Sequence, residues 1–323
     1  MHILVTGGTG FVGQHLGAAL LEHGHRVFLL GRDFGRSEHL LAAGANAVRA
    51  DLRDRAAVWA ACAGMDAVFH VGALSAPWGR AADFHAINVG GTEHVLAGCE
   101  QHNVGRVVVV SSPSVVFNGR DQHLLTDAAP YPSHFVSTYS LTKKLAEDRV
   151  HAAIARGLPA VIVRPKAIFG PGDTTLLPRI IAAARRGRLP QIGNGRNQVD
   201  LTYVGNVVHA LLLALDAPTA VGNTYTITNA EHPRLWDVIR TVLRRLDINA
   251  DLRVLPLHVA LMAARLLEFR ASITKREPLL TRYAVAILAR NQTYDISAAE
   301  RDLAYTPLVS LAEGIETTLA TLR

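Results

Sequence analysis

The first residues of the chain constrain its fold more than any other stretch. Residues 1–6 (MHILVT) form a short apolar run typical of a buried strand, residues 7–13 (GGTGFVG) form a glycine-rich turn, and a helical pattern of leucines follows. Gly8, Gly10 and Gly13 satisfy the pattern G-x-G-x-x-G. Glycines at such a turn let the backbone approach a pyrophosphate, whose charge the amide groups at the helix N-terminus hold. The sequence therefore predicts a dinucleotide-binding strand, turn and helix.

The rest of the first half alternates strands with helices. Apolar runs predict buried parallel strands at residues 26–30, 67–71, 107–110 and 160–163, and helical patterns lie between them at 83–102 and 138–156. Right-handed crossovers then arrange the strands as a doubly wound parallel sheet of the Rossmann type, which is an α/β fold.

The alternation of strands and helices becomes irregular after residue 165, where prolines and glycines interrupt it. We therefore expect two units, a dinucleotide-binding Rossmann domain over residues 1–165 and a smaller, mainly helical substrate domain over residues 166–323. Within the second unit, residues from about 203–228 are expected to return to the main sheet.

The composition is that of a soluble enzyme. With 323 residues, 49% of them hydrophobic, the chain is long enough to bury a large core. Only Cys62 and Cys99 occur, so no disulfide framework is expected, and a strand that begins at Met1 leaves no room for a signal sequence. We therefore expect a cytoplasmic protein. The net charge of +6 includes only short arginine runs without interleaved aromatic residues, a pattern that argues against nucleic-acid binding.

Tyr139 and Lys143 are four residues apart within the second predicted helix. This spacing puts both side chains on one helix face, so that an ammonium can lie close to a phenol. A nearby positive charge stabilises the phenolate and lowers the phenol's pKa from its usual value of about 10. Such a phenol can give a proton to a carbonyl, or take one from an alcohol, while a hydride moves. The spacing alone is common, and its meaning depends on the surrounding motifs.

Serines follow the predicted strand at residues 107–110, at the edge of the sheet where ligands bind in such folds. A hydroxyl at this edge can hydrogen-bond a substrate carbonyl while negative charge develops on its oxygen. Ser111, Ser112 and Ser114 are all candidates on position alone.

Together with the glycine turn, these motifs resemble the extended short-chain dehydrogenases over essentially the whole chain. Within that superfamily, the chain looks most like the 3β-hydroxysteroid dehydrogenase branch, including bacterial reductases that act on 2-alkyl-3-keto acids in olefin and β-lactone biosynthesis. The segments that carry the resemblance are the T-G-x-x-G-x-x-G pattern of Gly7, Gly10 and Gly13, and residues 139–147, 164–173, 200–204 and 301–307.

The resemblance implies a catalytic role for three residues. The family pattern S-S-x-x-V selects Ser112 to polarise the carbonyl, with Ser114 as runner-up, and Tyr139 is the implied proton donor. Lys143 is implied to lower the tyrosine pKa and to bind the nicotinamide ribose. Val116 and Phe117 depart from the family pattern, so the loop beyond the serine has no family template.

The resemblance also implies which residues line the cofactor. They lie in the glycine turn, after the strands that follow it, and at the catalytic helix: Gly7, Gly10, Phe11, Val12, Gly13, Arg32, Asp51, Leu52, Val71, Gly72, Ala73, Asn88, Tyr139, Lys143, Pro165 and Ile168.

The end of the second strand bears on which cofactor binds. An acidic residue there holds the ribose 2′-hydroxyl of NAD, whereas an arginine favours the 2′-phosphate of NADP. The family expects aspartate where this chain has Gly31, and Arg32 comes next. We therefore expect NADP(H), with NAD(H) as the alternative because Asp33 is nearby.

Fifteen histidines suggest a metal, but the spacing does not support one. His23 and His25 straddle a turn, and no further ligand follows at a recognised spacing, so we expect no metal site. His70 lies within an apolar strand and is expected to be a hydrogen-bonded core histidine.

The second half must determine the substrate. Residues 257–269 form an apolar helical stretch with a narrow polar stripe, and its 13 residues are too few to span a bilayer. Core packing is one interpretation; a lining for a long acyl or steroid substrate, an enzyme-complex surface and peripheral membrane contact are the others. If the substrate carries a carboxylate, Arg80 and Lys166 are candidates to bind it.

We therefore predict an NADPH-dependent reductase, expected to be a homodimer, that converts the ketone of a hydrophobic 2-alkyl-3-keto acid to a hydroxyl. In the reverse direction, the same residues would oxidise a 3β-hydroxysteroid or sterol, which is the first alternative. A nucleotide-sugar epimerase or dehydratase is the second. A cofactor-sensing regulator without turnover is disfavoured because Ser112, Tyr139 and Lys143 are all present.

Overall fold

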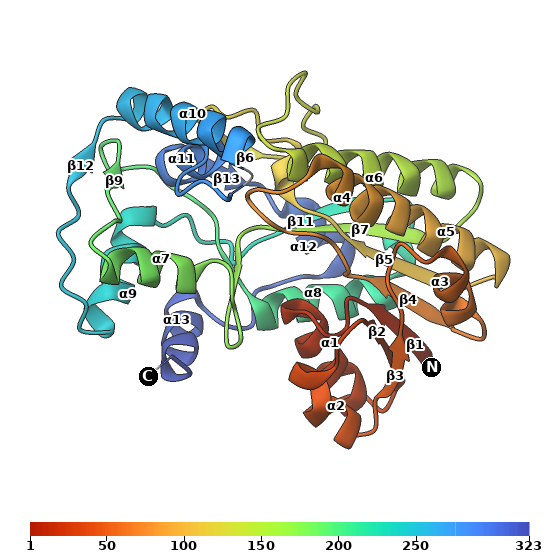
Figure 1. The fold of residues 1–323 in the computed structure, drawn as a ribbon. Helices are drawn as coiled ribbons and strands as arrows, with labels where there is room; N and C mark the ends of the chain where they lie inside the picture. Colours follow the sequence, from red (N-terminus) through yellow and green to blue (C-terminus); the bar gives the residue numbers. More distant parts are fainter. Residues whose placement is uncertain (275, 323) are drawn as a thin grey trace.

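The computed structural model describes residues 1–274 and 276–322 of the chain. Seven parallel strands form the central sheet in the order β11-β7-β5-β4-β1-β2-β3 (Figure 1). In chain order the strands are β1 (His2–Thr6), β2 (Arg26–Gly31), β3 (Asn46–Arg49), β4 (Ala67–His70), β5 (Arg106–Val110), β7 (Ala160–Pro165) and β11 (Thr224–Ile227). The strand order reverses between β1 and β4, which is where such sheets bind ligands. The predicted doubly wound α/β fold is confirmed.

Helices cover both faces of this sheet (Figure 1). One face carries α1 (Phe11–Glu22), α2 (Glu38–Ala42), α8 (Val204–Asp216) and α12 (Ser297–Leu303), and the other carries α3 (Arg55–Cys62), α4 (Ala81–Phe84), α5 (Gly91–Gln101) and α6 (Thr138–Ala155). The helix predicted at 83–102 is interrupted by a π-helical segment, His85–Gly90, between α4 and α5. Such π turns carry a locally widened backbone and are frequent at functional sites.

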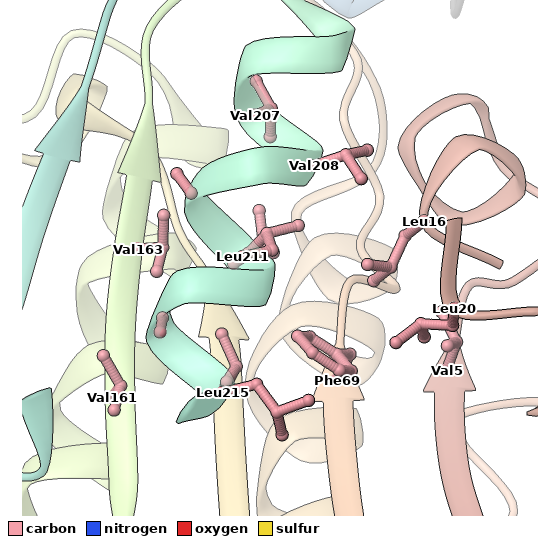
Figure 2. Close-up of a cluster of buried hydrophobic side chains, with 14 of the residues drawn as sticks. Val5, Leu16, Leu20, Phe69, Val161, Val163, Val207, Val208, Leu211 and Leu215 are labelled. Carbon is pink, nitrogen blue, oxygen red and sulfur yellow. The ribbon is translucent and has the colours of Figure 1, made fainter. Parts of the chain in front are cut away.

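The larger core lies between the sheet and the pair α1 and α8 (Figure 2). Leu211 and Leu215 of α8 lie over the strands, and Leu16 and Leu20 of α1 fill the space beside Phe69 of β4. All five side chains are buried. Burial of one such side chain contributes about 1.5–3 kcal/mol. The packing of α8 fixes the sheet edge that carries the predicted cofactor residues.

A second group of helices packs around its own core at one end of the sheet (Figure 1). Its helices are α7 (Leu177–Arg185), α9 (Leu235–Arg245), α10 (Leu257–Thr274), α11 (Arg282–Ala289) and α13 (Leu311–Ala320). Three parallel strand pairs accompany them: β8 (Ile168–Phe169) with β10 (Thr202–Tyr203), β9 (Gln191–Ile192) with β12 (Val254–Leu255), and β6 (Gln122–Leu125) with β13 (Gln292–Tyr294). Trp236 is buried at the centre of this core.

The chain passes between the central sheet with its flanking helices and the second group of helices more often than its sequence indicates. Residues 204–227 return to the main sheet as α8 and β11, as the pattern indicated. Two further crossings were not predicted: β6 of the first half pairs with β13, and α12 packs against β11 and α8. The division at residue 165 therefore stays a prediction about domains, since neither group is continuous in sequence.

Helix α10 differs from its prediction in length and in orientation. It continues to Thr274, giving 18 residues, and its inward residues are the small side chains Ala260, Ala264 and Ala271. Four of its large apolar side chains lie on the exposed face: Met262, Leu266, Phe269 and Ile273. Within the predicted stretch, core packing is therefore wrong for Met262, Leu266 and Phe269, whereas Leu257 and Leu261 are partly buried against the core of the second group. Among the described residues, no helix combines the length and hydropathy that crossing a bilayer requires.

Candidate active site

The glycine turn that follows β1 is built so that no side chain fits inside it. Gly7 has a φ of +66°, and a Cβ on it would lie 2.6 Å from the Cα of Gly72 in the loop after β4. A Cβ on Gly13 would lie 2.2 Å from the carbonyl oxygen of Gly7. The Gly10 amide donates to that same oxygen at 2.9 Å, and α1 begins at the next residue. The N-terminal amides of α1 therefore face a close-packed backbone cradle suited to an anion.

The start of α1 also meets the second half of the chain. The Phe11 ring lies 3.5 Å from the position that a Cβ on Gly170 would take, and His15 Nε2 lies 2.8 Å from the Pro171 carbonyl oxygen. Val12 follows Phe11 in the first turn of the helix. The loop after β8 therefore closes one side of the cradle.

Two of the predicted cofactor residues, Arg32 and Asp51, follow neighbouring strands. Gly31 ends β2 and is paired with Arg49 of β3, so that Arg32 and Asp51 emerge at the same sheet edge. The Arg32 guanidinium is 72% exposed and lies 3.8 Å from Asp51, an arrangement that leaves it free to meet a phosphate. A hydrogen bond from Arg53 lowers the pKa of Asp51 to about 2. Asp51 is therefore ionised at neutral pH.

The loop Val71-Gly72-Ala73 follows β4 and lies against the glycine turn. Leu52 lies under it, because a Cβ on Gly72 would come within 2.8 Å of the Leu52 side chain. Asn88, from the π-helical segment, accepts from the Leu74 amide at 2.7 Å and donates to the Leu74 carbonyl at 3.2 Å. The Asn88 amide also donates to Thr142 Oγ1 at 3.1 Å. Asn88 is thus in a position to hold the loop against the catalytic helix.

The pair Tyr139 and Lys143 lies in the first turns of α6, next to the end of β5. Ser137 caps this helix by accepting from the Ser140 amide at 3.1 Å. Lys143 is buried, with 3% of its surface exposed, and its Nζ donates to the carbonyl of Val110 at 2.7 Å. That bond ties the helix to the last residue of β5, immediately before the serines.

Burial is the largest influence on the pKa of both residues of this pair. Burial raises the pKa of Tyr139, and hydrogen bonding with Ser75 and Ser112 opposes the rise only in part. In this structure the Lys143 ammonium is held by the Val110 carbonyl, and the expectation that it lowers the tyrosine pKa stays a prediction. Burial also lowers the pKa of Lys143 to about 8, with Glu147 opposing. Tyr139 is fully protonated at neutral pH, as a proton donor must be.

The three candidate serines take different positions. Ser111 and Ser114 are buried, whereas Ser112 is partly exposed and interacts with the Tyr139 hydroxyl. Ser112 Oγ also accepts from the Ser114 amide at 3.2 Å, which caps the short turn Pro113–Val115. Of the three, Ser112 alone combines access with proximity to the tyrosine.

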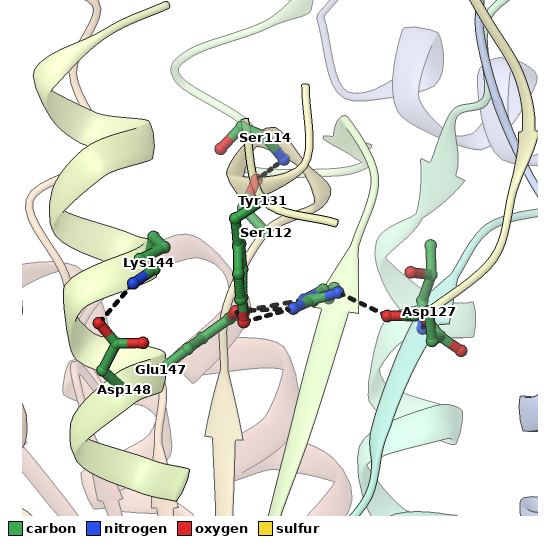
Figure 3. Close-up of polar contacts among 9 residues, drawn as sticks. Ser112, Ser114, Asp127, Tyr131, Lys144, Glu147 and Asp148 are labelled. Atoms are coloured by element: carbon green, nitrogen blue, oxygen red, sulfur yellow. Dashed lines mark hydrogen bonds and ion pairs between the residues drawn. The ribbon is translucent and has the colours of Figure 1, made fainter. Parts of the chain in front are cut away.

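A buried ion pair braces the catalytic helix from behind (Figure 3). Glu147, one turn after Lys143, accepts two hydrogen bonds from Arg164 of β7, at 2.8 and 2.7 Å, and one from the Tyr131 hydroxyl at 2.7 Å. Arg164 also donates to the Asp127 carbonyl at 3.4 Å. Burial would raise the pKa of Glu147, but the Arg164 bonds outweigh it and leave the pKa lowered. The pair stays charged and fixes α6 against the sheet.

Sequence reasoning missed two groups next to the tyrosine. Ser75, after the cofactor loop, interacts with the Tyr139 hydroxyl. Tyr283 of α11 interacts with Tyr139 and with the hydroxyl of Ser114, although Ser114 Oγ makes no hydrogen bond of good geometry. No local sequence pattern predicts a role for Tyr283, because it is distant in sequence from Tyr139 and reaches the site only through the packing of α11.

Two further predicted residues flank the site. Pro165 ends β7 and Ile168 begins β8, so both lie where the first half passes into the second.

His70 is a core residue, as predicted: its ring nitrogens hydrogen-bond with the hydroxyls of Thr6 and Thr92 at 2.7 and 2.9 Å, and burial lowers its pKa to about 3. Within the described part of the chain, no cluster of three or more His, Cys, Asp or Glu side chains is placed to hold a metal ion.

The chain matches one family model and is similar to several known proteins. The model of the 3-beta hydroxysteroid dehydrogenase/isomerase family matches residues 4–257. A 2-alkyl-3-oxoalkanoate reductase of Stenotrophomonas maltophilia is 38% identical, covering 98% of this chain and 97% of that protein. One of the same name from Shewanella oneidensis is 32% identical, covering 99% and 86%. The crystal structure of gox2253 is 26% identical, with a TM-score of 0.83 and coverage of 99% and 97%.

Proposed function

The chain belongs to the 3-beta hydroxysteroid dehydrogenase/isomerase family, whose members are NAD(P)-dependent oxidoreductases, and from this premise we propose that it reduces the ketone of a hydrophobic 2-alkyl-3-keto acid with NADPH. The observation that carries the proposal is the convergence of Tyr139, Ser112 and Lys143 beside the glycine cradle. The two relatives named as 2-alkyl-3-oxoalkanoate reductases support the substrate class.

The turn fits a dinucleotide, because Gly7 and Gly13 leave no room for a Cβ against the backbone of Gly72 and of Gly7, so that only glycines let the turn pack this closely before the α1 amides. Those amides and Arg32 would hold the phosphates, the loop at residues 71–73 would lie against the cofactor, and Lys143 would bind the ribose. The bound cofactor supplies a hydride to the carbonyl carbon of the substrate. We infer NADP(H) from the exposed Arg32, and Asp33 leaves NAD(H) as the alternative.

Ser112 and Tyr139 act on the carbonyl oxygen of the substrate. Ser112 donates a hydrogen bond to that oxygen, and so stabilises the negative charge that develops on it. Tyr139 then transfers its phenolic proton to the same oxygen, which becomes the hydroxyl of the product. The positive charge of Lys143 stabilises the phenolate that remains until a proton returns from solvent. Glu147 and Arg164 keep the helix that carries both groups in place.

We further propose that the substrate's alkyl chains lie against the helices of the second group and that the protein acts as a cytoplasmic homodimer. The two relatives named as 2-alkyl-3-oxoalkanoate reductases support a hydrophobic substrate rather than a sugar nucleotide. The exposed apolar face of α10 is the surface that a membrane or another enzyme would contact.

A substrate panel tests the proposal. The purified protein is incubated with NADPH and a 2-alkyl-3-keto acid, with NADP and a 3β-hydroxysteroid, and with NAD and a UDP-sugar. Consumption of NADPH with the keto acid, at least tenfold faster than either alternative, is the expected result. Preferential oxidation of the steroid, or epimerisation of the sugar, would replace the proposal with that alternative.

A further inference from the structure

Lys166 lies at the junction between the two halves and is held there by its backbone. Its amide donates to the carbonyl of Ile227 at 3.0 Å, and its carbonyl accepts from the Thr202 hydroxyl. The next residue, Ala167, has a φ of +42°, a conformation that non-glycine residues rarely adopt. Such strain persists where surrounding bonds over-determine it, and it clusters at functional sites. The position of Lys166 is therefore fixed by long-range contacts.

Its ammonium is buried among hydrogen-bond donors. Lys166 is 8% exposed, and Nζ donates to Gln292 Oε1 at 2.6 Å. The same ammonium lies 5.5 Å from the ring centre of Tyr294. Gln292 Nε2 and the Tyr294 hydroxyl are both buried, and neither has a hydrogen-bond partner. Buried polar groups are almost always paired, so two unpaired ones beside a lysine point to an absent acceptor.

The nearest carboxylate does not supply that acceptor. Asp200 acts on Lys166 only at a distance, and no acidic oxygen of the described residues lies within 4.0 Å of the ammonium. The two Asp200 oxygens are already committed, one to His232 Nδ1 at 2.6 Å and the other to the Tyr294 amide at 2.8 Å. Burial accordingly lowers the pKa of Lys166 to about 8, and a bound anion would raise it again.

This donor cluster lies beside the loop that follows the proposed catalytic serine. Tyr294 packs against Val115 and Val116, next to the serines. It is also within electrostatic range of Tyr283, and Tyr283 is within electrostatic range of Tyr139. In a 3-keto acid, the carboxylate and the ketone are separated by a single carbon, so a carboxylate site must lie close to the proton donor.

We propose that Lys166, with the Gln292 side-chain amide and the Tyr294 hydroxyl, binds the carboxylate of the substrate and thereby selects 3-keto acids over neutral ketones. This inference rests on the proposed function and names the group by which that substrate is recognised. The structure separates the two candidates of the sequence: the Arg80 side chain is 83% exposed and already lies 4.0 Å from Asp83, whereas Lys166 is enclosed. A charge-assisted bond in a buried setting is stronger than one at the surface.

The test compares an acid with its methyl ester. The stable 2-alkyl-3-hydroxy acid and its ester are oxidised with NADP by the full-length protein and by Lys166→Met. We expect kcat/KM for the acid to fall about 10- to 100-fold in the variant, mainly through KM, while that for the ester changes less than threefold. A structural role of Lys166 would lower both equally, and that result would overturn the proposal.

Two variants provide matched controls. Arg80→Met removes the rival cation, and Lys144→Met removes another ammonium that lies over a tyrosine ring, 5.2 Å from the centre of Tyr131. Both should retain the acid-to-ester ratio of the unaltered protein. A selective loss of acid turnover in Arg80→Met, with Lys166→Met unaffected, would move the anion site to the surface.

A measurement on the unaltered protein covers the case in which Lys166→Met does not fold. An unreactive 2-alkyl carboxylic acid should inhibit ester oxidation at least tenfold more strongly than its primary amide does. Equal inhibition would overturn the carboxylate site. If the unaltered protein oxidises both acid and ester with equal kcat/KM, the reaction type stands and only this inference fails; if it oxidises neither, the proposed function itself fails.

Discussion

The surroundings of Lys143 and of Lys166 show how the two sides of the site are built. Both lysines are buried, at 3% and 8% exposure, and burial lowers the pKa of each to about 8. Lys143 is held by a backbone carbonyl of the neighbouring strand, so any sequence that forms this helix beside this strand would place it there. Lys166 is held by a side chain 126 residues away, surrounded by unpaired donors. The cofactor side is thus set by local spacing, and the substrate side by long-range side-chain contacts.

Removal of the Tyr139 hydroxyl should have the largest effect on the cofactor side. Tyr139→Phe removes the proton donor and leaves the ring, so we expect kcat to fall about 10²- to 10⁴-fold. Cofactor affinity, measured by fluorescence titration with NADPH, should change less than threefold. Undiminished turnover in this variant would show that the chemistry does not depend on the tyrosine.

The buried ion pair behind the catalytic helix should affect stability more than a surface pair of the same type. Arg164→Met leaves Glu147 buried and unpaired, so the free energy of unfolding should fall by about 3–5 kcal/mol. Arg149→Met breaks the exposed pair with Glu93, whose side chains are 53% and 47% exposed, and should cost about 0–1 kcal/mol. Urea denaturation measures both. Equal losses would mean that the buried pair does not brace the helix.

The cofactor preference should depend on the exposed guanidinium after β2. In Arg32→Ala, kcat/KM for NADPH should fall about 10- to 100-fold, while that for NADH stays within threefold, because a 2′-phosphate loses a charge-assisted bond. Arg26→Ala, at the other end of the same strand, serves as the control. Parallel losses for the two cofactors would place the phosphate contact elsewhere.

The pH dependence should show the smallest effect. Burial lowers the pKa of Lys143 to about 8, so its positive charge is present below pH 8 and is lost as the pH rises through that value. Tyr139, with a raised pKa, stays protonated over this range. In the reduction of a 2-alkyl-3-keto ester with NADPH, which does not need Lys166, kcat should be halved near pH 8 and decline further above it. A flat profile up to pH 10 would show that the charge of Lys143 is not needed.

The same contrast explains which features the sequence alone could reveal. The sheet and the glycine turn follow from hydrophobic runs and from backbone that needs glycine, so both were predictable. The pair Tyr139 and Lys143 was predictable from helix geometry, but its electrostatics were not, because burial depends on the whole fold. Tyr283 and the Lys166 cluster depend on β13 and α11 packing against β6 and the serine loop, and such contacts leave no periodic signal. In α10, alternating alanines and large side chains gave no sign of which face turns inward.

Transfer of deuterium tests the central claim most directly. The protein is incubated with a 2-alkyl-3-keto acid and NADPH carrying deuterium in both C4 positions of the nicotinamide, and the product is analysed by mass spectrometry and NMR. The account predicts a 2-alkyl-3-hydroxy acid with one deuterium on C3 and a hydroxyl proton that comes from water. A product without deuterium at C3, or recovery of unreacted keto acid with intact NADPH, would contradict it.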